Sequence, residues 1–241
     1  MVRTVWQDSR YDANEYGTKL VHSLVPGTDF DFPKSVFNIY DCIAPILYKR
    51  KNAVVLDFFA GSGTTGHAVL ILNKEDKEIG YINFILCTNN ENKIAEDVCY
   101  PRIKKVIKGH KDYPELTNIP ANLKYFRTDF VDAEPTNRNK QKLTRKAIEM
   151  LCFKEGTFEK VISKKNFKIF RNSNHFTGII FDPLQIPEFK STISKIKGSI
   201  SVYIFSLGGD LYEDEFDELK SKVTLSPIPE AILRLYRKIF K

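Results

Sequence analysis

The segment from Val54 to His67 constrains this chain more than any other. An apolar run that stops at Asp57 predicts a buried strand, placed over 53–58, and a turn on Gly61 and Gly63 follows. The next residues predict a helix. A parallel strand that stops at an acid, turns on glycines and enters a helix presents a ligand crevice at the carboxyl end of a sheet. Ligand binding is therefore the first hypothesis.

A phosphate-binding loop is excluded by its chemistry. Gly61 and Gly66 have the spacing of GxxxxGK[ST], but His67 and Ala68 stand where Lys and Ser or Thr are required. The loop therefore lacks the cation that pairs with the phosphates and the hydroxyl that binds magnesium.

A dinucleotide is the second candidate ligand. Gly61, Gly63 and Gly66 spell GxGxxG, the pattern that places a pyrophosphate on a helix start. In that fingerprint the strand runs almost directly into the first glycine, whereas Asp57 and three further residues intervene here. A carboxylate facing the loop would repel a pyrophosphate and would suit a cationic ligand.

S-adenosylmethionine is such a ligand, because it carries a sulfonium and an ammonium group. Asp57 could engage the methionine end directly or through water, and Phe59 could lie on the adenine. A glycine turn without any ligand is the remaining interpretation.

The run DFFAGSGTT, from Asp57 to Thr65, resembles the cofactor motif DPFxGSGTT of amino-methylating DNA methyltransferases. Phe58 replaces the usual Pro. The resemblance implies a Rossmann-like methyltransferase core that binds S-adenosylmethionine. The loop residues that it assigns to the cofactor are Asp57, Phe59, Ala60, Gly61, Ser62, Gly63 and Thr64.

Two flanking segments extend the resemblance. The run 29–35 is similar to an FxxPKP segment that packs beside the cofactor, which implies roles for Phe32, Pro33 and Lys34, while Ser35 replaces the second Pro. Downstream, NNEN at 89–92 and the run 97–104 resemble the modification (Mod) subunits of type III restriction-modification systems. Thr88 stands where an acid is expected to bind the ribose hydroxyls, so Glu91 is the candidate. Glu91 could instead begin a helix.

The catalytic motif of that family, [DNS]PP[YFW], does not occur in this sequence. The nearest string, Asp182-Pro183-Leu184-Gln185, lacks the second Pro and the aromatic residue, and we interpret it as a strand end and a turn. No catalytic residue is predicted. The chain resembles the carboxyl-terminal portion of a Mod subunit, either a split subunit or a truncated product, and alone it is expected not to methylate DNA.

The resemblance implies transfer of a methyl group from S-adenosylmethionine to the exocyclic amine of adenine in DNA. The implied partners are DNA, a polypeptide that supplies the catalytic and target-recognition half, and a restriction (Res) subunit; a homodimer is compatible. Two alternatives remain: a non-catalytic subunit for cofactor binding or assembly, and a nicotinamide-dependent oxidoreductase supported only by GxGxxG. Adenine cannot be distinguished from cytosine, because the recognition region is not present in the sequence.

Composition adds little to this assignment. The net charge of +7 and the pI of about 9.1 permit a polyanionic partner, although the lysines are spread throughout. The four cysteines lack metal-type spacing, so no metal is predicted, and those at 42, 87 and 152 are expected to be buried. No signal peptide or apolar run of membrane length is evident, which favours a cytoplasmic protein.

The chain is expected to form a cofactor-binding unit over 1–130 and a small α/β accessory unit over 131–241. Alternating elements predict a parallel, doubly wound sheet in the first. Its predicted elements are helices 34–49, 64–73 and 91–108 and strands 53–58, 80–87 and 123–126. Those of the second are helices 140–153, 187–197, 213–221 and 229–240 and strands 159–163, 167–170, 177–181, 200–206 and 222–225.

Overall fold

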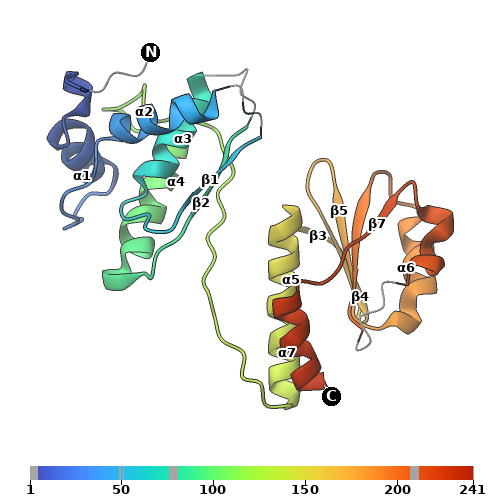
Figure 1. Ribbon diagram of the computed structural model, residues 1–241. Coiled ribbons are helices and arrows are strands. Elements are labelled where there is room, and N and C mark those ends of the chain that lie inside the picture. The colour runs from blue at the N-terminus through green and yellow to red at the C-terminus, as the bar shows by residue number, and fades with distance from the viewer. Residues whose placement is uncertain (1–4, 49, 51, 76–80, 207–211, 241) are drawn as a thin grey trace. The chain divides into compact units, whose positions relative to one another are not determined.

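The computed structural model describes residues 5–48, 50, 52–75, 81–206 and 212–240. The chain forms two compact units, Met1–Arg127 and Thr128–Lys241 (Figure 1). Both units combine helices with parallel strand pairs, which confirms a mixed α/β protein.

The first unit is built on a parallel pair of strands. Strand β1 (Val54–Asp57) pairs with β2 (Asn83–Leu86), and helix α3 (Thr64–Glu75) is the crossover between them. The helix lies close to the sheet at Gly66, where an added Cβ would come within 2.9 Å of the Leu86 side chain. Only glycine permits this approach without displacement of the neighbours.

Two helices pack with α3. Helix α2 (Val36–Leu47) lies against it, and α4 (Tyr100–Lys108) follows two short helical turns, η3 (Glu91–Lys93) and η4 (Ile94–Cys99). Buried apolar side chains of these helices and of the amino-terminal segment form one core with the sheet's inner face. It includes Leu20, Leu24, Val36, Ala68, Leu70, Ile71, Ile103 and Val106.

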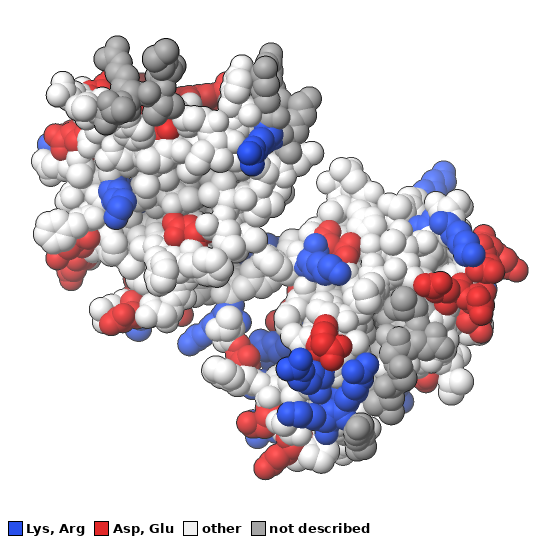
Figure 2. Space-filling view, viewed as in Figure 1, with Lys and Arg blue, Asp and Glu red and all other residues white. Residues whose placement is uncertain are grey.

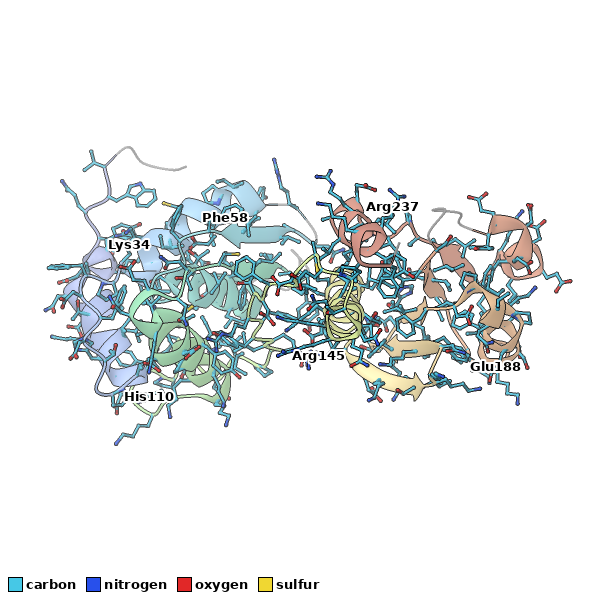
Figure 3. The ribbon with its side chains drawn as sticks, turned by 90° about the horizontal axis from the view of Figure 1, so that it is seen from below. Lys34, Phe58, His110, Arg145, Glu188 and Arg237 are labelled. Atoms are coloured by element: carbon cyan, nitrogen blue, oxygen red, sulfur yellow. The ribbon has the colours of Figure 1, made fainter. Side chains whose placement is uncertain are left out.

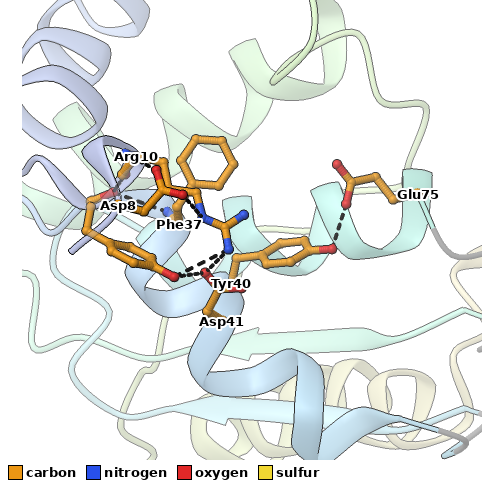
Figure 4. A network of polar contacts seen from close by, with 8 residues as sticks. Asp8, Arg10, Phe37, Tyr40, Asp41 and Glu75 are labelled. Carbon is orange, nitrogen blue, oxygen red and sulfur yellow. Dashed lines mark hydrogen bonds and ion pairs between the residues drawn. The ribbon is translucent and has the colours of Figure 1, made fainter. Parts of the chain in front are cut away.

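The amino-terminal segment is helical, which the sequence patterns did not predict. It comprises η1 (Ser9–Tyr11), the π-helical turn η2 (Asn14–Lys19) and α1 (Leu20–Leu24). Arg10 ties it to α2 through an ion pair of 2.6 Å with Asp41 (Figure 4). Tyr40 of α2 also donates a hydrogen bond to Glu75 of α3, and these contacts fix the three segments together.

One face of the β1–β2 sheet is uncovered. Val54 is 57% and Leu56 49% exposed, and both lie on the same face of β1 because they are two residues apart. Val55, on the other face, packs in the core. The expectation that β1 is buried is therefore wrong for this face within the first unit, because none of the unit's described elements covers it. Few charged side chains lie on the face of this unit shown in Figure 2.

The second unit contains a five-stranded mixed sheet of order β3-β4-β5-β6-β7. Pairing is antiparallel from β3 to β5 and parallel from β5 to β7. The strands are Glu159–Ser163, Phe167–Arg171, Phe176–Ile180, Ile200–Ile204 and Val223–Leu225.

Helices cover both faces of this sheet. Helices α5 (Asn137–Glu155) and α7 (Glu230–Phe240) pack side by side on one face (Figures 1 and 3). Helix α6 (Ile186–Ile193), which follows the turn η5 (Pro183–Gln185), and η6 (Glu213–Leu219) lie on the other. The apolar stripe of α7 is thus buried within its own unit.

Several expectations need correction. No strand forms at 123–126, where the chain is irregular. Helix α5 begins at Asn137, three residues before the expected start at 140, because Thr136 caps it by accepting a hydrogen bond from the Asn139 amide. Cys42 is exposed, since it lies on the outer side of α2. The run Gly208-Gly209-Asp210, whose composition predicts a turn, lies outside the described residues. No helix in the described part of the chain is both long and apolar enough to span a membrane.

Candidate functional site

Asp57 ends β1, and its carboxylate is held in place by two hydrogen bonds. One oxygen accepts from the Phe59 amide at 3.0 Å and the other from the Thr65 hydroxyl at 2.6 Å. These bonds join the strand end to the first turn of α3. A carboxylate can accept about four hydrogen bonds, so acceptor capacity for a ligand remains.

The glycine turn adopts a conformation that few other residues reach. Gly61 has φ +51° and Gly63 has φ +82°. At Gly63 a Cβ would also come within 2.9 Å of the Cys99 sulfur. The Ala60 amide donates to the Cys87 carbonyl, which holds the loop against the end of β2. Backbone strain and crowding thus both require glycine at 63.

The sequence-predicted residues around this loop divide into exposed and buried ones. Phe59 is 92% exposed, whereas Ala60, Ser62 and Thr64 are buried. The hydroxyls of Ser62 and Thr64 point inward to Arg102, so these residues can offer a ligand only their backbone groups. Among the described residues, the amides of Thr64, Thr65 and Gly66 have no backbone acceptor.

The structure brings the 29–35 segment beside the glycine loop. The Phe30 ring lies 3.6 Å from the position that a Cβ on Gly61 would occupy. Phe32, at φ +53°, is 92% exposed. Lys34 is exposed and lies in the same unit as Phe58 (Figure 3). Exposed aromatic rings on both segments are unusual for a surface without a partner or ligand.

A hollow of about 370 Å³ lies along Phe32, Pro33 and Lys34. Its other side is formed by the helical turn η2, through Asn14 and Thr18. Gly17 of the same turn lies so close to Pro33 that a Cβ would come within 2.4 Å of its carbonyl oxygen. The segment therefore packs closely against η2 at this point.

Glu91 lies at the carboxyl end of β2, on the same sheet edge as Asp57. It is exposed, and it begins the short turn η3. Asn90, Asn92 and Lys93 all have positive φ, a strained conformation that non-glycine residues rarely adopt. Such strain clusters at ligand sites. The structure brings Glu91 to the same edge as the loop, and its ribose contact stays a prediction.

Sequence reasoning missed the buried polar cluster beneath the loop. Arg102 of α4 is 0% exposed and donates to the Ser62 and Thr64 hydroxyls, both at 2.9 Å. Arg102 also lies 3.3 Å from Nδ1 of His67, whose Nε2 lies 2.7 Å from the Leu116 carbonyl. His67 therefore donates from Nε2 and accepts at Nδ1. Arg102 begins a basic stretch, a composition that is common on a solvated helix face, yet this side chain is fully buried.

Burial shifts both titrating groups of this cluster. It lowers the pKa of Arg102 to about 10, so the guanidinium remains charged at neutral pH. Burial, with the charge of Arg102, lowers the pKa of His67 to about 3, so the imidazole is neutral.

This shift predicts acid sensitivity of the first unit. Below pH 6.5 the unfolded chain protonates His67 and the folded chain does not, so stability falls as pH drops towards 3. The contribution is about 1.4 kcal/mol per pH unit. We expect His67→Gln to reduce the slope of unfolding free energy against pH by this amount, measured by urea unfolding with Trp6 fluorescence. The exposed His22→Gln is the control, and equal slopes in all three proteins would contradict the assignment.

The segment Asp182–Gln185 forms the end of a strand and a turn, as η5 with Asp182 as its cap. It lines a separate hollow of about 390 Å³ with Phe181, Phe205 and Tyr236 in the second unit. Within the described residues, no group of three or more His, Cys, Asp or Glu side chains is placed to hold a metal ion.

Comparison with known proteins identifies the class to which the first unit is related. Residues 1–99 match a family model described as DNA methylase. The match covers the glycine loop, Asp57 and Glu91.

Three relatives narrow this class. The Mod subunit of the type III restriction-modification enzyme StyLTI from Salmonella typhimurium is 42% identical over 116 residues, 46% of this chain and 16% of that protein. The type II methyltransferase M.KpnI from Klebsiella pneumoniae is 40% identical over 135 residues, which are 54% of this chain and 28% of that protein. The EcoPI Mod subunit from Escherichia phage P1 is 34% identical over 110 residues, 44% and 16%.

These matches confirm the recognition made from the sequence. Residues 1–99 are similar to DNA methylases, and type III Mod subunits are among the proteins that the chain resembles. The chain spans between 16% and 28% of the lengths of these three relatives.

Proposed function

We propose that residues 1–130 form the S-adenosylmethionine-binding part of an adenine-specific DNA methyltransferase of the type III Mod kind. The observation that carries this proposal is the loop at the end of β1. It combines a fixed carboxylate with spare acceptor capacity, two glycines at positive φ and an exposed phenylalanine. The related proteins are DNA methyltransferases, which supports the same ligand class.

Each proposed contact follows from a group that the loop exposes. Asp57 accepts from the ammonium group of the methionine moiety and attracts the positive sulfonium. Phe59 supplies an exposed ring on which adenine stacks. Glu91, at the neighbouring strand end, accepts from the ribose hydroxyls. Phe32, Pro33 and Lys34 form the wall beside the loop, where the Phe30 ring packs at Gly61.

The bound cofactor supplies the methyl group that is transferred. This chain's residues hold the donor and exclude water from one side of it, because displacement needs chiefly that donor and acceptor be held in contact. We propose no catalytic residue in the chain. A Rossmann-like, doubly wound core would then be complete only with further strands beside β1 and β2.

The uncovered face of the β1–β2 sheet supports a polypeptide partner. Val54 and Leu56 are half exposed on a two-stranded sheet whose described strands each leave one edge unpaired. Exposed strand edges and apolar faces pair with other chains unless they are covered. We propose that a polypeptide carrying the catalytic and target-recognition half packs on this face. DNA is then the substrate of the assembly, and a Res subunit and a cytoplasmic location fit a restriction-modification system.

The alternative of a non-catalytic subunit for cofactor binding or assembly rests on the same uncovered face. The two alternatives differ in one result: the methyltransferase proposal expects methyl transfer to DNA by the assembled complex, and the non-catalytic alternative does not require it. For residues 131–241 we propose an accessory role beside the cofactor-binding part.

Calorimetric titration of the purified chain with S-adenosylmethionine tests the proposal, with NAD as the control. We expect saturable binding of S-adenosylmethionine and no heat with NAD. The chain alone should transfer no labelled methyl group to DNA. Binding of NAD alone would overturn the family-based function, and methyl transfer by the isolated chain would overturn the proposed division of roles.

A further inference from the structure

A positive charge lies buried directly behind the glycine loop. The Arg102 guanidinium is fully buried, and its described hydrogen-bond partners are all neutral: the Ser62 carbonyl and hydroxyl, the Thr64 hydroxyl and the His67 ring. Its Nε is buried without any partner among the described residues. A buried charge without an opposite charge is strongly unfavourable, because its lost hydration is not replaced by an ion pair.

Among the described residues, no carboxylate forms an ion pair with Arg102. Asp57 bonds the Phe59 amide and the Thr65 hydroxyl rather than the guanidinium. Burial raises the pKa of the neighbouring Cys99 thiol to about 11, so this group is neutral.

The loop itself adds further positive potential. Thr64 begins α3, a helix of 12 residues, and the amides of its first turn carry the positive end of the helix dipole. Arg102 bonds side chains at this same helix start. Two positive sources therefore face the loop from behind, and an anionic group in front of it would offset both.

We propose that Arg102 is a positioning residue that holds the glycine loop and, through its charge, selects a ligand bearing a carboxylate. This rests on the function proposed above and assigns the methionine carboxylate of S-adenosylmethionine to the loop's amides, while Asp57 takes the cationic groups. Arg102 touches the loop and not the ligand. If Arg102 only supported the loop structurally, a neutral hydrogen-bond donor to the Ser62 and Thr64 hydroxyls would be sufficient.

The test compares S-adenosylmethionine with decarboxylated S-adenosylmethionine, which keeps the sulfonium and the amine. Calorimetry with the full chain should show at least about tenfold weaker binding of the decarboxylated ligand. In Arg102→Met we expect this ratio to fall towards one, mainly through weaker binding of the intact ligand. Arg102→Lys, which keeps the charge, should retain the ratio.

Three outcomes separate the possibilities. A wild-type chain that binds both ligands equally overturns the inference without any variant, so a folding defect in Arg102→Met cannot hide the answer. Equal loss of both ligands in a folded Arg102→Met also overturns it, since that is what structural support alone predicts. A wild-type chain that binds neither ligand overturns the proposed function instead.

Discussion

Asp57→Asn should weaken S-adenosylmethionine binding by about 30-fold or more. The expected loss corresponds to about 2 kcal/mol for a hydrogen bond to a charged group. The amide keeps an oxygen that accepts from the Phe59 amide, so the loop can hold its shape while the negative charge is lost. Calorimetric titration measures the change, and circular dichroism checks the fold.

Two comparisons make this result specific. Asp97→Asn removes one negative charge from an exposed position in the first turn of η4, and it should leave affinity unchanged. S-adenosylhomocysteine lacks the sulfonium charge, so its affinity should fall less in Asp57→Asn than that of S-adenosylmethionine. Unchanged affinity of Asp57→Asn for S-adenosylmethionine would remove Asp57 from the site.

The glycine loop could be predicted because its constraints are local. An apolar run, an acid and glycines at fixed spacing require a strand, a turn and a helix within one short segment, and the structure has them at β1 and α3. The same holds for most of the second unit, where strands such as 159–163 agree with the structure to the residue. A local sequence pattern is sufficient to predict a strand whose two faces are apolar or a helix with one apolar stripe.

The Arg102–His67 cluster could not be predicted in this way. Arg102 is separated from its partners Ser62, Thr64 and His67 by 35 to 40 residues. Such polar residues are also common on exposed helix surfaces, so none of them indicates burial by itself. Only the packing of α4 against the start of α3 shows that Arg102 is buried. The sequence of α4 contains one indication of this burial, because Arg102 lies one and four residues before the buried Ile103 and Val106, on the inner side of the helix.

The uncovered sheet face marks a different limit. The apolar run at Val54–Leu56 is typical of a strand that is buried on both faces. The local sequence pattern does not indicate which segment or partner covers each face. The structure supplies cover for Val55 but not for its neighbours. The mismatch between an apolar strand and its exposure is thus itself informative about a partner.

This mismatch leads to the second large expected effect. The wild-type chain should self-associate at high concentration through the face bearing Val54 and Leu56, and it should bind an apolar fluorescent dye. Val54→Glu combined with Leu56→Lys should shift the chain to monomer. Re-burying two half-exposed aliphatic side chains contributes about 2 kcal/mol, so the dissociation constant should rise by roughly 30-fold or more. Sedimentation velocity measures the association.

A matched pair of changes elsewhere controls for charge. Met150 and Leu184 are also exposed, 53% and 83%, and both lie in the second unit. Met150→Glu combined with Leu184→Lys should leave association and dye binding unchanged. Because Val54 and Leu56 lie on the face opposite to the core, their replacement should also leave S-adenosylmethionine affinity intact. A wild-type chain that stays monomeric and binds no dye would mean that this face is covered in solution, and the proposed partner would lose its docking surface.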